Sequence, residues 1–96
     1  MKLTEAGIKD TLRQHPGWTF DDNAFARTFT FPDFADAVAF VTRLGFDAEA
    51  ADHHPDLAIS YRKVTVSWST HSEGGVTEKD VAGIAAADRV ATRLGA

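Results

Sequence analysis

The chain has 96 residues, 44% hydrophobic and 25% charged, a composition typical of one small globular domain and not of a disordered segment. It has no cysteine, which excludes disulfides and thiolate metal sites, and its formal net charge of −4 does not favour nucleic-acid binding. Because no apolar run approaches the ~18 residues that cross a membrane, and because the start of the chain is polar, we expect one domain over residues 1–96 with no signal peptide, membrane contact or nucleic-acid partner.

The first elements predicted along the chain are a helix and a β-hairpin. Apolar residues at helical spacing predict a helix over residues 4–14, which the Pro-Gly dipeptide at 16–17 ends. An Asp-Asp-Asn turn then separates the β-like runs 18–20 and 24–31, which predicts a hairpin.

The most regular apolar pattern of the chain predicts a second helix over residues 34–50. The apolar positions expected on its buried face are Phe34, Ala37, Val38, Val41, Leu44 and Ala48. A third helix is predicted after the glycine loop 72–75, because Thr77 and Asp80 have the spacing of a capping box. Its expected apolar stripe consists of Ile84, Ala87, Val90, Ala91 and Leu94.

A second hairpin is predicted between these two helices. Apolar residues alternate with small polar ones over 57–61 and again over 64–68. A turn at 62–63 would pair the two runs with all six apolar side chains on one face. The predicted partners are Tyr61 with Val64, Ile59 with Val66 and Leu57 with Trp68. Continued backward, the same pairing places His54 opposite His71 on the polar face.

The order helix, strand, strand, helix, strand, strand, helix (αββαββα) predicts an α+β fold. We expect a two-layer sandwich, in which a four-stranded antiparallel sheet carries three helices on one face. The other face is then either solvated or covered by self-association, and the open edges of the sheet favour self-association.

Three of the four histidines, His53, His54 and His71, are candidates for proton transfer, because imidazole has an ordinary pKa of about 6.5 and exchanges protons near neutrality. Glu49 is close enough in sequence to orient an imidazole, and Asp80 could do the same besides capping a helix. The alternative for each is an ordinary surface or capping residue. We expect the three imidazoles to gather in one cleft.

Metal ligation by the histidines and a carboxylate is a second interpretation, although their spacing matches no standard zinc pattern. Cysteine nucleophiles are excluded, and no Gly-x-Ser-x-Gly turn or phosphate-binding loop is present. The chemistry that remains is non-covalent acid/base catalysis by histidine on a bound small molecule.

The chain resembles the pterin-4a-carbinolamine dehydratase family in three motifs: E-x-x-x-H-H-P at 49–55, S-T-H at 69–71 and, after a glycine loop, T-E-K-D at 77–80. The likeness extends over about residues 18–90. It implies a cytoplasmic hydro-lyase that removes water from 4a-hydroxytetrahydrobiopterin, a pterin-4a-carbinolamine, to give quinonoid dihydropterin and so supports tetrahydropterin recycling. It also implies a homodimer or homotetramer that needs no metal and no cofactor.

By the motif of the family, His53, His54 and His71 line the pterin pocket, and Glu49 and Asp80 occupy its acidic positions. Loss of a tertiary hydroxyl beside a ring nitrogen needs one proton delivered to oxygen and one withdrawn from nitrogen. We predict that His53 and His54 exchange these protons, in either assignment, and that His71 positions the pterin while the two acids tune the imidazoles. The alternatives are a catalytically silent binding or regulatory module on the same fold, and a histidine-ligated metal protein.

Overall fold

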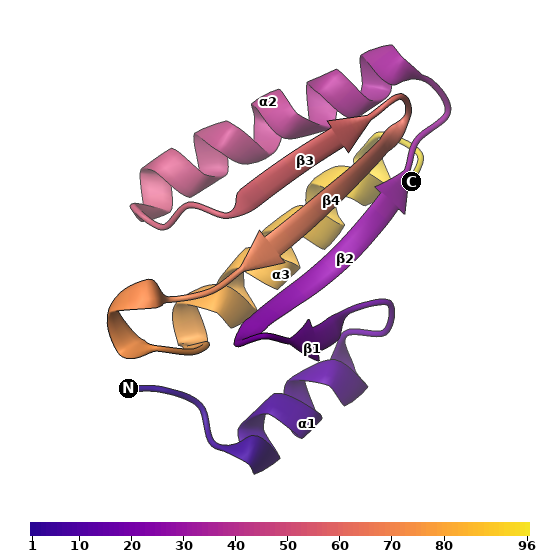
Figure 1. The fold of residues 1–96 in the computed structure, drawn as a ribbon. Helices are drawn as coiled ribbons and strands as arrows, with labels where there is room; N and C mark the ends of the chain where they lie inside the picture. Colours follow the sequence, from indigo (N-terminus) through magenta and orange to yellow (C-terminus); the bar gives the residue numbers. More distant parts are fainter.

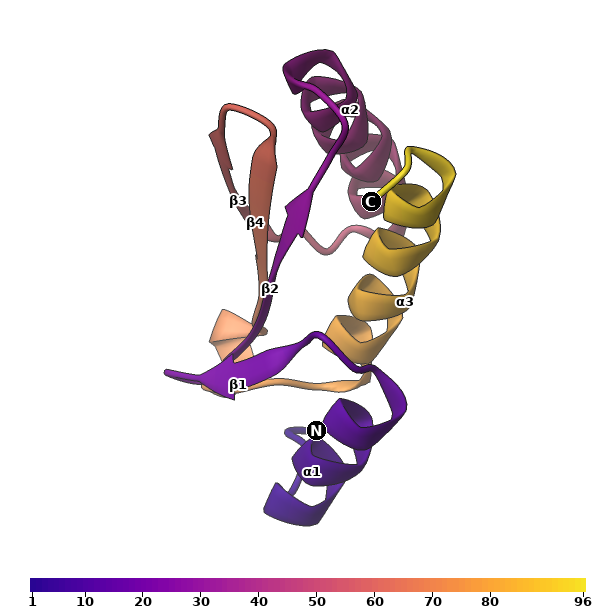
Figure 2. The ribbon, with the colours of Figure 1, turned by 90° about the vertical axis from the view of Figure 1, so that its right-hand side faces the viewer.

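The computed structural model describes all 96 residues and confirms the predicted α+β fold. Its elements are α1 (Glu5–Gln14), β1 (Thr19–Asp21), β2 (Ala24–Thr30), α2 (Phe34–Ala51), β3 (Asp56–Ser60), β4 (Lys63–Trp68), the short 3₁₀ helix η1 (His71–Glu73) and α3 (Glu78–Arg93). The four strands form one antiparallel sheet in the order β1-β2-β4-β3 (Figure 1). Helices α2 and α3 cover one face of this sheet, α1 lies beside β1, and the opposite face is bare (Figure 2). No helix is both long and apolar enough to cross a membrane.

Short polar side chains begin all three α-helices, and of these only the cap at Thr77 was predicted from the sequence. Thr4, Asp33 and Thr77 are the N-caps, and the side chain of each accepts a hydrogen bond from a backbone N–H of the first helical turn. Such caps satisfy N–H groups that have no partner within the helix. The predicted starts of the helices are therefore confirmed to within one residue.

The end of α2 directs the chain toward the histidines. Asp52 adopts a left-handed conformation with φ 52° and ψ 41°, and its N–H bonds to carbonyl groups of the last helical turn. The N–H of His53 donates to the carbonyl oxygen of Ala48 at 3.1 Å, which completes a Schellman-type termination. The backbone at His53 and His54 is therefore fixed by a helix cap.

The core lies between the sheet and helices α2 and α3. Phenylalanines from a strand and a helix meet in its centre, since the ring centroids of Phe29 and Phe40 are 5.2 Å apart. A close approach of α3 to the sheet requires glycine at position 83, because a Cβ atom there would lie 2.4 Å from the ring of Trp68. This contact matters for the site, since Trp68 also packs on a histidine.

The second hairpin turns one residue earlier than predicted. Tyr61 and Arg62 form its turn, and Tyr61 has a φ of 54°. The observed partners are Ile59 with Val64 and Leu57 with Val66, so all three predicted pairs are wrong. A shift by two residues preserves the face of every side chain in the strands, so the apolar face was predicted correctly except for Tyr61, which lies in the turn and is 86% exposed.

Pairing between β3 and β4 ends at Asp56 and Ser67, so the predicted opposition of His54 and His71 is also wrong. Pro55 has no N–H with which to continue the ladder.

The predicted buried face of α2 is partly wrong as well. Ala37, Leu44 and Ala48 are buried, but Phe34 is 58% exposed and Val38 is 42% exposed. Phe40, which the predicted stripe omits, is fully buried instead. The stripe is therefore rotated about the helix axis, and α2 presents apolar side chains to solvent along one flank.

Candidate active site

Asp80 is the one charged side chain that is fully buried. Its Oδ1 lies 2.6 Å from Nε2 of His53, and its Oδ2 accepts hydrogen bonds from the hydroxyl of Thr70 at 2.7 Å and the N–H of Thr77 at 2.8 Å. The capping box predicted for Thr77 and Asp80 is present. Asp80 therefore caps α3 and contacts a histidine at the same time, because each of its oxygens serves a different partner.

The partners of Asp80 bear on which nitrogen of the His53 ring carries the hydrogen. Oδ2 accepts two hydrogen bonds, and with Asp80 acting as a carboxylate the His53 nitrogen that faces Oδ1 is the donor. Nε2 then carries the hydrogen in the neutral ring and Nδ1 keeps a free lone pair. The ring is also stacked on Trp68, with centroids 5.5 Å apart and planes 17° from parallel, and its side chain is only 13% exposed. His53 is thus a rigidly held imidazole with one basic nitrogen.

His54 forms a second histidine–carboxylate pair at the surface. Its Nε2 lies 2.9 Å from Oε1 of Glu49, and the two side chains are 56% and 81% exposed. Glu49 was placed by sequence four residues before His53, but its partner in the structure is His54. Adjacent side chains of an extended segment point to opposite sides, so the last turn of α2 can reach only one of them. An exposed pair of this kind contributes little to stability, about 0–1 kcal/mol.

His71 begins the 3₁₀ helix η1 and lines a polar depression of about 400 Å³. The depression lies at the end of the sheet, where Asp56, Ser67 and Ser69 also line it. Ser69 is fixed there, because its hydroxyl donates to the carbonyl oxygen of Asn23 at 2.8 Å. Of the cavities in the structure, this is the one that combines an imidazole with hydroxyl and carboxylate groups.

The single chain does not gather the three imidazoles into one cavity. His53 lines a separate apolar cavity of about 60 Å³ together with Trp68 and Gly83, and His54 lines no cavity. The tandem of His53 and His54 is therefore divided between the buried side and the surface. No three His, Asp or Glu side chains are arranged to hold a metal ion.

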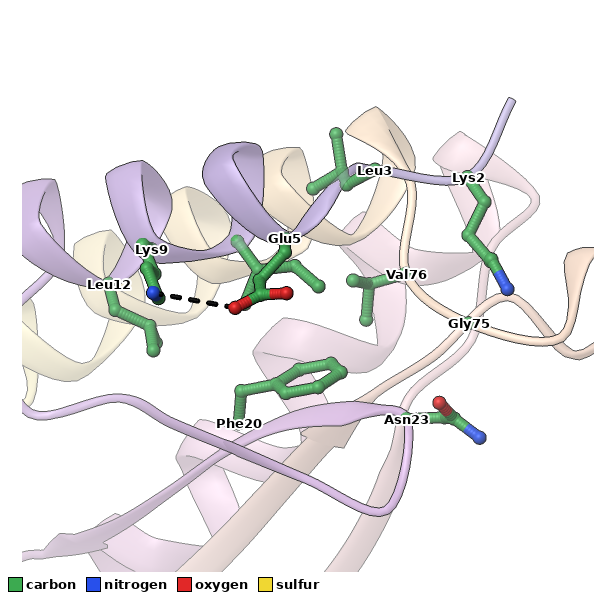
Figure 3. A pocket seen from close by; sticks show the side chains of 10 residues that line it. Lys2, Leu3, Glu5, Lys9, Leu12, Phe20, Asn23, Gly75 and Val76 are labelled. Atoms are coloured by element: carbon green, nitrogen blue, oxygen red, sulfur yellow. Dashed lines mark ion pairs between the residues drawn. The ribbon is translucent and has the colours of Figure 1, made fainter.

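A further cavity of about 400 Å³ lies between α1 and β1 (Figure 3). Leu3, Leu12 and Phe20 supply much of its apolar lining, and Lys9 and Glu5 form an ion pair of 3.4 Å at its edge. No histidine contributes to it. It therefore offers no imidazole, and the candidate active site is the region of the two histidine–carboxylate pairs and the polar depression.

Sequence reasoning missed two contributors to this region. The sequence analysis gave Thr70, the central residue of the S-T-H motif, no role, yet its buried hydroxyl contacts Asp80. Trp68 was expected in the core, and it is buried, but it also supports the ring of His53. The alternation of side chains along β4 indicated this role for Trp68. It places the side chain of this last strand residue on the buried face, where it can contact residues at the end of an adjacent helix.

Known proteins resemble this chain over most of its length. The sequence model of the family described as "Pterin 4 alpha carbinolamine dehydratase" matches residues 1–90. A protein of Chloroflexus aurantiacus, which carries a provisional name as a pterin-4-alpha-carbinolamine dehydratase, is 47% identical over 89 residues, covering 93% of this chain and 96% of its own.

Two solved structures resemble the chain. A Brucella melitensis protein described as a transcriptional coactivator/pterin dehydratase has a TM-score of 0.91 and 38% identity, and the match covers 95% of this chain and 99% of that one. A pterin dehydratase-like protein identified as a RuBisCO assembly factor in the alpha-carboxysome has a TM-score of 0.64 and 20% identity, and covers 77% of this chain and 86% of its own. At that identity the second protein shares the fold alone.

Proposed function

The chain belongs to the pterin-4a-carbinolamine dehydratase family, and on this premise we propose that it removes water from 4a-hydroxytetrahydrobiopterin to give quinonoid dihydropterin, as a hydro-lyase in tetrahydropterin recycling. The names of its relatives support pterin carbinolamine dehydratase activity. The observation that carries the proposal is the pair of histidine–carboxylate contacts, His53 with Asp80 and His54 with Glu49. Two differently placed imidazoles provide the two proton transfers that dehydration requires.

In the proposed mechanism His53 is the general base. Its Nε2–H is held by Asp80, so Nδ1 is the nitrogen that accepts a proton from the pterin ring. The buried carboxylate then stabilises the imidazolium that forms, which lowers the cost of the transfer. The contact with Asp80 and the stacking of Trp68 on one face of the ring together prevent the ring from turning.

His54 is the proposed general acid. It is exposed, so it can reach a bound ring, and its Nε2 lies 2.9 Å from the carboxylate of Glu49, which orients the imidazole. A proton from His54 would leave with the departing 4a-hydroxyl group as water. Each imidazole would contribute about 10²–10⁴-fold to the rate.

His71 is proposed to position the pterin. The polar depression that it lines has a size in the range of about 300–1,000 Å³ found for small-molecule sites, and its hydroxyl and carboxylate groups can bond the polar edge of a pterin. Asp56 lines the depression two residues after His54, so a ring bound there lies near the histidine tandem. We propose no metal and no cofactor for this reaction.

We also propose a homodimer or homotetramer in the cytoplasm. Three observations support self-association: β3 is an edge strand with one open side, its Ile59 is 43% exposed, and α2 exposes Phe34 and Phe46. Edge strands with apolar side chains readily pair with a second copy. The exposed apolar flank of α2 offers a second contact area of the same character.

The direct test is an assay of 4a-hydroxytetrahydropterin dehydration by the purified protein. We expect acceleration over buffer that survives treatment with a metal chelator. A rate equal to that in buffer would contradict the proposal and favour a silent binding module. Activity that is lost to the chelator, with stoichiometric zinc by elemental analysis, would favour the metal protein instead.

A further inference from the structure

The hydroxyl of Thr70 connects the two sides of the candidate site. Thr70 follows β4 and is buried, and its hydroxyl donates to Oδ2 of Asp80 at 2.7 Å. The same oxygen lies 3.0 Å from the hydroxyl of Thr77. Because a hydroxyl has one hydrogen, and that of Thr70 goes to Asp80, Thr77 is the donor of this second bond. The hydroxyl of Thr77 in turn accepts from the N–H of Lys79 at 3.2 Å.

In this series of hydrogen bonds each hydroxyl accepts from the group before it and donates to the group after it. The series runs from the start of α3 through Thr77 and Thr70 to the carboxylate of Asp80, whose other oxygen accepts from His53. Two donors on Oδ2 hold the plane of the carboxylate, so Oδ1 can face only the imidazole. The orientation of His53 therefore depends on how Oδ2 is held.

The capping of α3 does not need the hydroxyl of Thr70. The capping box consists of two hydrogen bonds. The N–H of Thr77 donates to the side chain of Asp80, and the side chain of Thr77 accepts from a backbone N–H of the first turn. Both bonds stay in place when the Thr70 hydroxyl is removed. The Thr70 hydroxyl therefore acts on the carboxylate of Asp80 and not on the cap of the helix.

The backbone of Thr70 also holds the loop that carries His71. Its N–H donates to the carbonyl oxygen of Gly75 at 2.8 Å, and its carbonyl accepts from the N–H of Glu73 at 3.0 Å. Thr70 and Gly75 form an isolated β-bridge that closes this loop. One residue therefore acts on His53 through its side chain and on His71 through its backbone.

We infer that Thr70 is a positioning residue of the site: its hydroxyl fixes the carboxylate of Asp80 and thereby keeps His53 in the Nε2–H form with Nδ1 free. The catalytic part of this inference rests on the proposed dehydration. The structural part, the tautomer of His53, does not, so the two can fail separately.

The test compares Thr70→Val, which removes the hydroxyl at nearly constant volume, with Thr70→Ser, which keeps it. The matched control is Thr11→Val, because Thr11 is also buried and donates its hydroxyl to a backbone carbonyl, that of Gly7, at 2.9 Å far from the site. Nitrogen-15 shifts of the imidazole rings report the tautomer, and dehydration kinetics report kcat and KM.

In the wild type and in the Thr11→Val and Thr70→Ser variants, we expect a single Nε2–H form of neutral His53. Thr70→Val is expected to give a mixture of both tautomers. Its kcat should fall about tenfold with KM little changed, a part of the ~10²–10⁴-fold that a positioned base contributes. Rescue by serine distinguishes the hydroxyl from the bulk of the side chain.

An unchanged Nε2–H signal in a folded Thr70→Val variant would overturn the inference. So would a wild-type His53 that carries its hydrogen on Nδ1, a result that needs no variant and applies even if the valine variant does not fold. If tautomer mixing occurs in a protein that does not accelerate dehydration, the positioning of His53 is supported and the proposed function is what fails.

Discussion

Nε2 of His53 lies 2.6 Å from Oδ1 of Asp80, and this contact joins the segment after α2 to the first turn of α3. A fully buried carboxylate is normally costly unless its hydrogen-bonding sites are occupied. Here a histidine, a threonine hydroxyl and a backbone N–H occupy them. The energetic requirement to satisfy the acid thus helps to fix the imidazole, together with its stack on Trp68.

Asp80→Asn is expected to destabilise the protein by about 2 kcal/mol, because an amide has only one accepting oxygen, so either the donors of Thr70 and Thr77 or the donor of His53 is left facing an NH2 group and unsatisfied. Glu49→Gln is the matched change at the other histidine. It should cost less than about 0.5 kcal/mol, since that pair is exposed. Urea unfolding of both variants gives the comparison. Equal stability losses would contradict the distinction between the two pairs.

Gly83→Ala should destabilise the protein by about 1–3 kcal/mol, the usual cost of overpacking a core. The added Cβ would lie 2.4 Å from the ring of Trp68, and moving that ring disturbs the stack on His53. We therefore also expect slower dehydration.

Gly45→Ala is the control for this change, because nothing lies within 4 Å of a Cβ added there, in the middle of α2. It should stabilise the protein by about 0.5–1 kcal/mol through helix propensity. Thermal or urea unfolding tests both variants. A stabilising Gly83→Ala change would show that the contact between α3 and Trp68 is looser than described.

Ile59→Lys is expected to weaken self-association. Ile59 is 43% exposed on the edge strand β3, and a charged side chain at an edge opposes pairing with a second copy. Sedimentation velocity should show a dimer or tetramer for the wild type and a smaller species for the variant. Gln14→Lys, an exposed change on α1, controls for added charge. A wild-type monomer would contradict the proposed assembly.

The fold was predictable from the sequence because each element carried its own signal. The capping pattern of Thr77 and Asp80 and the apolar spacing of α2 are local features, and local features determine where helices begin and end. The strand faces were predictable for a similar reason. Alternation fixes which side chains share a face even when the pairing is displaced by two residues.

The register of the second hairpin and the pairing of His53 and His54 with different carboxylates were not predictable in this way. The turn at Tyr61 depends on a left-handed conformation that aromatic residues seldom adopt, so propensity alone favoured the following residue. Glu49 precedes His53 by four residues and His54 by five, a difference too small to decide which of them it contacts. Which of them it meets depends on the helix cap at Asp52, a feature of three-dimensional geometry.

The contact of Thr70 with Asp80 joins two segments across the loop that contains η1. Nothing in the composition of that loop indicates how tightly it closes. The same is true of the stack of His53 on Trp68, which requires both the sheet register and the end of α2 to be known.

The central claim is that the histidines of the two carboxylate pairs transfer the protons of dehydration, and kinetics of histidine variants test it most directly. Rates of 4a-hydroxytetrahydropterin dehydration would be measured for His53→Ala, His54→Ala and His15→Ala, the last as control because His15 lies at the end of α1 away from the site. We predict losses of about 10²–10⁴-fold for His53→Ala and His54→Ala and a wild-type rate for His15→Ala. Wild-type rates for both His53→Ala and His54→Ala would contradict the account.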